Sequence, residues 1–455
     1  MLFSTQPFLL IFLPIALLLF YVPWTREAQR KLVLLLASLV FYAFWDLRFV
    51  PFLVFMVAMT WLCVLVSLTF AHRWVLIFAV FLNLGVLVFF KYTNFLLENI
   101  LGIFGLPFES FSIILPLGIS FFTFQQISYL LDVRRGVAGK YHLLDYFVYV
   151  CFFPQLIAGP IVRHNELIPQ FSFVFRTRVN FEYLTCGLVL FILGLSKKVF
   201  IADELGVLVD PVFASAAMSP VNFDLALQAI LGFTLQLYFD FSSYSDMALG
   251  LGALFGLKLP INFDRPYVSL TVREFWRRWH ITLSRFFTDY VYIPLGGNRH
   301  KYRIYLAIFL TMVLSGVWHG AGWTFIFWGG FHGLAICINR LWEKTGLGLP
   351  VIAAWLLTFL TWTGLIVFFR ADDLATAYSM YQSLFQVQVF DPIDMSWLFV
   401  SVVFAAAIFG PTNVEMSRSR FLRYLPSLCL VALLGVATSL RIGTGRGLEF
   451  IYFQF

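Results

Sequence analysis

The chain has 455 residues, of which 61% are hydrophobic and only 12% are charged. A soluble domain carries about 25% charged residues, so this composition excludes a water-soluble globular protein. The net charge of +7 indicates the excess of Lys and Arg that membrane proteins keep on their cytoplasmic side, and it does not indicate nucleic-acid binding.

Apolar runs of membrane-spanning length recur from one end of the chain to the other. A helix crosses the bilayer core with roughly 20 apolar residues. The sequence therefore predicts an all-α, polytopic membrane protein with about ten to thirteen hydrophobic helices, organised as a single domain over residues 1–455. The candidate segments are 7–23, 32–45, 49–70, 74–91, 112–131, 144–162, 184–201, 224–255, 304–318, 321–338, 350–369, 396–410 and 424–440.

The first apolar run is not typical of a cleaved signal peptide. It has no basic region before it and no small-residue cleavage site after it. The first basic cluster, made of Arg26, Arg30 and Lys31, follows the run. By the positive-inside rule, we expect the N-terminus outside the cytoplasm and the first loop inside it.

The stretch that begins ILPLGISFF is interrupted by residues that are unusual in a simple membrane span. Pro116 and Gly118 stand near its start, and Gln125 and Asp132 follow. Irregular backbone and polar groups at membrane depth are tolerated where protein or a cavity covers them. This pattern is compatible with a re-entrant segment or with a helix buried among other helices.

Polar side chains also lie inside the apolar run 224–255. Gln236, Asp240 and Ser243 share one helical stripe. Acidic groups within a membrane segment face the protein interior. We therefore expect either a structural hydrogen-bond network around Asp240 or a substrate contact there.

Basic residues outside these runs have simpler interpretations. Lys197 and Lys198 are interpreted as a membrane boundary. Four histidines stand beside polar loop residues and are expected to be solvated: His72, His142, His164 and His300. The sequence predicts no metal site, since neither the histidines nor the five cysteines show metal-ligand spacing.

The stretch 271–286, TVREFWRRWHITLSRF, predicts an amphipathic helix. Thr271 and Glu274 form a capping box at its start. One stripe is apolar, and the second stripe carries Arg273, Trp276, Arg277, His280 and Ser284. The structural interpretation is an interfacial helix with snorkelling arginines. The functional interpretation is a cationic, aromatic surface that holds a phosphate-bearing donor, to which Arg278 also contributes.

The stretch 315–333, SGVWHGAGWTFIFWGGFHG, places His319 among glycines and beside Trp318. A histidine at membrane depth is unfavourable unless it faces a cavity or a partner. Neutral imidazole can take the proton of a hydroxyl, so His319 is a candidate general base. The alternative is a buried histidine that donates to a backbone carbonyl, with the glycines serving helix packing. We favour this structural interpretation for His332.

Six phrases follow one another along the chain: ILPLGISFFTFQQISYLLDVRRG (113–136), FFPQLIAGPIVRHNEL (152–167), LYFDFSSYSDMALGLGALFGLKLPINFDRPY (237–267), FWRRWHITLSRFFTDYVYIPLGGNR (275–299), LSGVWHGAGWTFIFWGGFHG (314–333) and FIYFQF (450–455). In this order they resemble the membrane-bound O-acyltransferase family and most of all its bacterial branch of alginate and polysaccharide O-acetyltransferases. The resemblance runs over the whole chain, and the ordered combination is specific where one phrase alone is not.

The resemblance implies a funnel-shaped helical fold with a channel, which an acyl donor enters from the cytoplasm and an acceptor from the other side. The family's invariant histidine falls on His319, and its second polar position falls on His280, so both are expected to be catalytic. In this branch the acetyl group passes to an exported polysaccharide with the help of extracytoplasmic partner proteins, often including a hydrolase-like acetyltransferase. The expected substrate-binding residues are Trp276, Arg273, Arg277, Arg278, Trp318 and Asp240.

We therefore predict an O-acyltransferase of the bacterial cytoplasmic membrane. It would move acetyl from acetyl-CoA or another cytoplasmic acyl thioester toward an extracytoplasmic polysaccharide, without a tightly bound cofactor. Within the family, the alternatives are transfer of D-alanine and acylation of a lipid, a teichoic acid or a peptidoglycan sugar. From another class, the alternative is a transporter of a polymer or carrier, although no inverted repeat is visible in the sequence.

Overall fold

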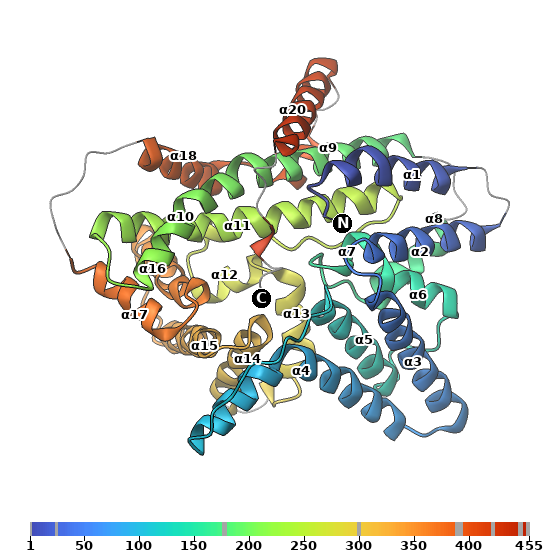
Figure 1. The fold of residues 1–455 in the computed structure, drawn as a ribbon, viewed down its shortest axis with the longest axis horizontal. Coiled ribbons are helices and arrows are strands. Elements are labelled where there is room, and N and C mark those ends of the chain that lie inside the picture. Colours follow the sequence, from blue (N-terminus) through green and yellow to red (C-terminus); the bar gives the residue numbers. More distant parts are fainter. Residues whose placement is uncertain are drawn as a thin grey trace. The chain divides into compact units, whose positions relative to one another are not determined.

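The structure, a computed structural model, describes residues 2–22, 26–174, 180–297, 302–386, 395–419, 424–444 and 449–451. All regular secondary structure in these residues is helical (Figure 1), which confirms the predicted all-α fold class. The predicted span 49–70 is observed without change as α3, Phe49–Phe70. Other spans differ at their ends, and α4 continues to Ile103 where the sequence predicted an end at residue 91. The predicted span 144–162 is wrong as one helix, because it is broken into Leu143–Cys151 and Phe153–Leu156.

The chain divides into two compact units, each assembled from three separate stretches. Unit 1 contains residues 1–195, 244–260 and 420–445, and unit 2 contains residues 196–243, 261–419 and 446–455. One helix, α11 (Phe223–Leu254), contributes residues to both. The expectation of a single domain stays a prediction.

Unit 1 is built mainly from the N-terminal helices. They are η1 (Phe8–Phe12), α1 (Leu13–Tyr21), α2 (Glu27–Ala43), α3, α4 (Trp74–Ile103), α5 (Ile119–Arg134), α6 (Leu143–Cys151), α7 (Phe153–Leu156), α8 (His164–Val174), most of α9 (Phe181–Lys197) and α20 (Leu425–Gly443). Long-range packing within unit 1 joins α4 to α5 and α2 to α6.

Unit 2 holds the helices on which the candidate site residues lie. They are η2 (Lys198–Ala202), α10 (Asp203–Ala216), η3 (Pro266–Val268), α12 (Val272–Arg278), α13 (Ile281–Phe287), η4 (Thr288–Tyr292), α14 (Arg303–His319), α15 (Trp323–Glu343), α16 (Val351–Arg370), α17 (Leu374–Ser383), α18 (Met395–Phe409) and α19 (Asn413–Arg418). The most extensive pairing in the described residues is between α14 and α15.

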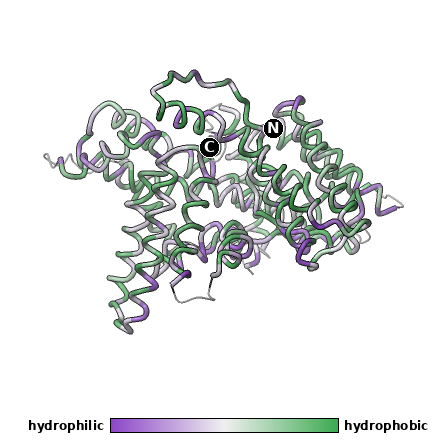
Figure 2. The backbone as a smooth tube through the Cα atoms, turned by 90° about the horizontal axis from the view of Figure 1, so that it is seen from below, coloured by the Kyte–Doolittle hydropathy of each residue, from purple (hydrophilic) through white to green (hydrophobic). Residues whose placement is uncertain are grey.

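Six helices in the described residues are long and apolar enough to cross a membrane. They are Phe49–Phe70, Trp74–Ile103, Phe181–Ala216, Phe223–Leu254, Val351–Arg370 and Leu425–Gly443. Shorter apolar helices accompany them, and Figure 2 shows hydrophobic residues along most of the helical path. Large apolar side chains such as Phe55, Phe81 and Leu433 are exposed, as lipid-facing residues would be. The chain is therefore a multi-pass membrane protein.

Helix α5 shows that the stretch that begins ILPLGISFF contains a buried helix, which is one of the two interpretations given above. Gly118 precedes it with a φ of 73°, in the left-handed region that favours glycine. A Cβ at this position would also collide with the carbonyl oxygen of Leu156. Gln125 and Asp132 are buried within the helix. The segment is therefore a helix buried among other helices.

Asp240 of α11 belongs to a buried ion cluster, which we call the anchor cluster: Lys198, Asp203 and Asp240. The Lys198 Nζ lies 2.7 Å from Oδ1 of each carboxylate. The other Asp240 oxygen accepts a hydrogen bond of 2.9 Å from the backbone N–H of Ile451. The Lys198 ammonium also lies 4.5 Å from the Phe450 ring centroid. The cluster thus fixes segment 449–451 within unit 2.

The anchor cluster corrects one sequence interpretation and confirms another. Lys198 is only 2% exposed, so its interpretation as a membrane-boundary residue is wrong. Its charge is accommodated because two carboxylates and a backbone carbonyl surround it. Asp240 is equally buried and faces the protein interior, as expected for an acid within an apolar helix.

Glycines allow α14 and α15 to pack backbone against backbone. A Cβ on Gly316 would collide with the Phe325 carbonyl oxygen, and a Cβ on Gly329 would collide with the Met312 carbonyl oxygen. The packing role proposed for these glycines is therefore present. Because α14 ends at His319, this close pairing also fixes the position of the predicted base.

We expect Gly329→Ala to destabilise unit 2, because the colliding atom, the Met312 carbonyl oxygen, belongs to the backbone and not to a flexible side chain. Overpacking costs about 1–3 kcal/mol, and backbone contacts relax least. Gly330→Ala is the matched control, since its Cβ would meet the nearest atom at 3.8 Å and alanine is the better helix former. Thermal unfolding in detergent measures both variants. Equal melting temperatures for the two would contradict the packing role.

Candidate functional site

The predicted amphipathic helix over 271–286 is two helices, α12 and α13, separated at His280. The start is as predicted: the Thr271 side chain accepts a hydrogen bond of 3.0 Å from the Glu274 N–H. The helix then breaks, because His280 has a φ of 41° and a ψ of 53°, in the left-handed region. The prediction of one continuous helix is therefore wrong.

The break is stabilised by a segment that lies earlier in the chain. The Ile281 N–H donates to the Asn262 carbonyl at 2.9 Å, and the Asp264 N–H donates to the Arg278 carbonyl at 3.0 Å. The Asn262 side chain accepts a further bond of 2.7 Å from the Thr282 hydroxyl. These partners satisfy backbone groups that a helix break would otherwise leave unpaired.

A pocket of about 480 Å³ lies beside α12 and α13 in unit 2, and we call it the arginine pocket. Its charged and polar lining includes Arg273, Arg277, Arg285, Arg340, Tyr292 and Ser284. Its apolar lining includes Trp276, Ile308, Met312 and Ile336. The arrangement suits a ligand that has an anionic part and an apolar part, because guanidinium groups bind phosphates and carboxylates strongly.

The structure redistributes the predicted arginines. Arg273 and Arg277 line the pocket as their shared stripe predicts, and Arg273 also pairs with Glu343 at 3.0 Å. Arg278 instead pairs with Glu274 at 3.0 Å and with Asp264 at 3.4 Å. These two ion pairs link α12 to the segment before it, so Arg278 has a structural role.

Two arginines that line the pocket, Arg285 and Arg340, were not predicted from the sequence as substrate-binding residues. Arg285 lies on the far side of the helix break, so helical spacing from Arg273 did not connect them. Arg340 follows a long apolar run on α15 and looks like the charged end of a membrane span. Only the packing of α15 against α12 brings Arg340 to the pocket.

His319 is the last residue of α14 and is 4% exposed. Gly320 follows with extended backbone, so the helix ends beside this histidine. Its ring lies in edge contact with Trp328 and Phe369, each at a centroid distance of 5.1 Å. Ser315, one helical turn earlier on the same face of α14, lines the arginine pocket. Helix α14 therefore carries both a lining residue of the pocket and, one turn later, the imidazole of His319.

His280 lies close to the same group of rings. It is fully buried and stacks on Phe241 at a centroid distance of 4.7 Å. Trp318 lies 6.1 Å from the His280 ring and 4.9 Å from the His319 ring. Burial lowers the pKa of His280 to about 3, so its imidazole is neutral at physiological pH. The rings of the two predicted histidines thus both lie near the Trp318 ring.

His332 differs from its sequence interpretation. It is buried, at 1% exposure, as a structural histidine would be. However, neither of its ring nitrogens has a hydrogen-bond partner among the described residues, so the predicted bond to a backbone carbonyl is wrong. Aromatic rings from α12 and α15 pack around it instead.

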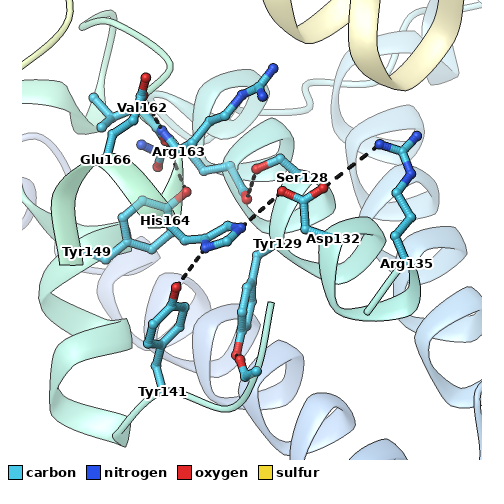
Figure 3. A network of polar contacts seen from close by, with 12 residues as sticks. Ser128, Tyr129, Asp132, Arg135, Tyr141, Tyr149, Val162, Arg163, His164 and Glu166 are labelled. Atoms are coloured by element: carbon cyan, nitrogen blue, oxygen red, sulfur yellow. Dashed lines mark hydrogen bonds and ion pairs between the residues drawn. The ribbon is translucent and has the colours of Figure 1, made fainter. Parts of the chain in front are cut away.

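A further histidine that the sequence analysis placed in solvent is buried in unit 1. His164 is 1% exposed, so that expectation is wrong, although His72 and His142 are exposed as expected and His300 lies outside the described residues. Figure 3 shows His164 between Tyr141 and Asp132, at 2.9 Å from the Tyr141 hydroxyl and 3.0 Å from the Asp132 carboxylate.

This network satisfies both nitrogens of the His164 ring. A neutral imidazole has one donor and one acceptor, which match the Asp132 carboxylate and the Tyr141 hydroxyl. Arg135 lies on the other side of the carboxylate, with its Nη1 at 3.9 Å (Figure 3). The network ties α5 to α8 and to the loop that carries Tyr141, and it is a structural use of a buried histidine.

Comparison with known proteins gives one family match and several related sequences. The model of the membrane-bound O-acyltransferase family matches residues 133–372, which include the whole arginine pocket and His319. The chain is 42% identical to the peptidoglycan O-acetyltransferase of Helicobacter pylori, over 84% of this chain and 80% of that protein. It is 43% identical to the probable alginate O-acetylase of Pseudomonas aeruginosa, over 85% and 75%. It is 30% identical to the teichoic acid D-alanyltransferase of Streptococcus thermophilus, over 50% and 57%.

Proposed function

Because the chain belongs to the membrane-bound O-acyltransferase family, we propose that it moves an acetyl group from an acyl thioester on the cytoplasmic side toward an extracytoplasmic polysaccharide. Membership makes the protein an O-acyltransferase, and it sets aside the transporter alternative. The acetyl group, the thioester and the acceptor are the parts that we propose.

The observation that supports this proposal most is that helix α14 carries both a lining residue of the arginine pocket and His319. The pocket is lined by four arginines and by Ser315 of α14. One turn later on the same face stands the imidazole of His319. A donor whose phosphates meet the arginines can thus extend its acyl group along α14 toward a base.

The reaction that we assign to this arrangement forms an ester and releases a thiol. His319 takes the proton of the acceptor hydroxyl while the hydroxyl oxygen bonds to the acyl carbon. The carbon–sulfur bond then breaks, and the thiolate leaves with its electron pair and takes up the proton that His319 removed. A neutral His280, near Trp318, would assist by orienting the acyl group.

The donor side can be tested through the pocket arginines. We expect Arg277→Ala and Arg340→Ala each to raise the donor KM by about 10- to 100-fold, because a lost charge-assisted contact is worth roughly 1.5–3 kcal/mol. The acceptor KM should change little. Arg48→Ala is the control, since Arg48 pairs with Asp46 within unit 1 and is not among the residues that line the pocket. An unchanged donor KM in both pocket variants would reject the phosphate role.

Relatives suggest two acceptor classes and one different acyl group. The names of the Helicobacter and Pseudomonas relatives point to acetyl transfer onto peptidoglycan or alginate, and the Streptococcus relative points to D-alanyl transfer. The greater identity and coverage of the O-acetylating relatives favour acetyl for this chain. Partner acetyltransferases outside the cytoplasm would complete the transfer to the polymer.

One experiment separates these acyl groups. The purified protein in detergent is incubated with radiolabelled acetyl-CoA, or with D-alanine thioesterified to a carrier protein, together with alginate or peptidoglycan fragments. We expect acceptor-dependent thiol release with acetyl-CoA as the donor and none with the D-alanyl carrier protein. Turnover only with the D-alanyl carrier would reject the acetyl proposal. Turnover with neither donor, also after addition of an extracytoplasmic extract of the native cells as a source of partner proteins, would reject the thioester.

We place the protein in the bacterial cytoplasmic membrane with its N-terminus outside. This orientation puts Arg30 and Lys31, near the start of α2, on the cytoplasmic side. A single cysteine introduced at Ser4 in a variant lacking the other cysteines should react with a membrane-impermeant maleimide in intact cells. Labelling only after lysis would reverse the orientation.

A further inference from the structure

Three neighbouring aromatic side chains of unit 2 carry buried nitrogen atoms, and we call them the nitrogen cluster: His332, Trp276 and Trp328. Their exposed fractions are 1%, 8% and 1%. The His332 ring lies 5.2 Å from the Trp276 ring and 4.9 Å from a ring of the Trp328 indole. Both nitrogens of His332 and the Nε1 of each tryptophan have no hydrogen-bond partner among the described residues.

Such a cluster is unfavourable unless something outside the protein chain completes it. Each buried polar group without a partner costs about 1–3 kcal/mol, and such groups in native proteins commonly mark a water or ligand site. The fold itself provides the contrast. His164 is just as buried, yet both of its ring nitrogens have partners in Tyr141 and Asp132.

The donor and acceptor balance tells which kind of partner the nitrogen cluster needs. An indole N–H only donates, and a neutral imidazole donates once and accepts once. The two indoles and the one imidazole therefore offer three donors against a single acceptor. The excess of donors calls for an oxygen atom that accepts hydrogen bonds.

The position of the nitrogen cluster narrows this choice to one oxygen of the reaction. Trp276 lines the arginine pocket, as does Ile336, one helical turn after His332 on α15. On the other side, Trp328 contacts His319 at a centroid distance of 5.1 Å. The cluster therefore contacts both the pocket that would hold the donor and the proposed base, and the acyl carbonyl is the oxygen that must come close to both.

We infer that the nitrogen cluster binds the carbonyl oxygen of the acyl group, which makes His332, Trp276 and Trp328 further catalytic residues. This inference rests on the function proposed above. When the acceptor oxygen bonds to the carbonyl carbon and His319 takes its proton, the carbonyl oxygen gains negative charge. Donors fixed around that oxygen stabilise the negative charge. The oxygen loses this charge again when the C=O bond re-forms and the carbon–sulfur bond breaks.

Kinetics give the first test. His332→Phe and Trp328→Phe each remove nitrogen and keep an aromatic ring. We expect each to lower kcat about 10²-fold, as for loss of one oxyanion donor, while the donor KM changes by less than about threefold. His142→Phe is the matched control at an exposed histidine. A wild-type kcat in both cluster variants would overturn the inference.

Spectroscopy gives a readout that a purely structural role would not move. The probe is acetonyl-dethia-CoA, in which a methylene replaces the thioester sulfur, with a ¹³C label in its ketone. In the wild-type protein we expect the carbonyl stretching frequency to fall on binding, since hydrogen bonds weaken the C=O bond. In folded His332→Phe or Trp328→Phe the frequency should return toward that of the free probe. An unshifted wild-type frequency, or a shift that survives both substitutions, would overturn the inference.

A comparison of ligands separates failure of this inference from failure of the proposed function. S-ethyl-CoA has the same phosphates but no acyl carbonyl next to the sulfur. Tighter binding of the ketone by the wild-type protein, lost in the cluster variants, supports the inference. Equal binding of both analogues rejects the inference and leaves the donor proposal standing. Binding of neither analogue rejects the proposed donor, and the inference with it.

Discussion

Replacement of His319 by alanine is expected to lower acceptor-dependent thiol release about 10²–10⁴-fold, which is the usual contribution of a positioned base. The variant removes an imidazole at the end of α14, while the arginine pocket stays intact. The donor KM should therefore change little while kcat falls. Initial rates of thiol release, measured at saturating acceptor, test this expectation.

His142→Ala controls for the loss of a histidine as such, because His142 is exposed and lies in unit 1. It should keep the wild-type rate. If His319→Ala is folded and its kcat stays within threefold of wild type, the imidazole at this position is not the base. Loss of folding is recognised by size-exclusion chromatography, and His319→Gln then provides a polar replacement of similar size.

Lys198→Met is expected to cause the largest loss of stability. It leaves Asp203 and Asp240 buried together without their shared cation. Removing one partner of a buried ion pair costs about 3–5 kcal/mol, because the remaining charge is uncompensated. The apparent melting temperature in detergent, compared with that of Lys258→Met at an exposed lysine, measures the effect.

The double variant Lys198→Met with Asp240→Asn sharpens this test. It removes a negative charge together with the positive one, and the amide oxygen can still accept from the Ile451 N–H. We expect it to recover part of the lost melting temperature. A double variant less stable than Lys198→Met would show that the charge of Asp240 is not what destabilises the single variant.

The sequence predicted the helical architecture well because apolar length alone determines it. The span 49–70 appears unchanged as α3, and the run 224–255 appears as α11. The helix break at His280 was beyond reach. It depends on Asn262 and Asp264, whose backbone groups meet the break only after the chain folds back.

Local pattern found part of the candidate site and missed the rest for a similar reason. Arg273 and Arg277 share one stripe of a short helix, so spacing brought them together correctly. Arg285 and Arg340 reach the same pocket from other helices, and no spacing in the chain connects them. Lys198 was assigned to a membrane boundary because its compensating carboxylates become visible only in three dimensions.

The left-handed backbone of His280 decides how its chemistry should be studied. A residue with a φ of 41° is strained unless it is glycine or one of the few side chains, asparagine among them, that visit this region readily. An alanine or valine at this position would disturb the turn between α12 and α13 as well as remove the imidazole. Asparagine would keep the turn and a hydrogen-bonding side chain, so the loss of activity in His280→Asn reports on the ring alone.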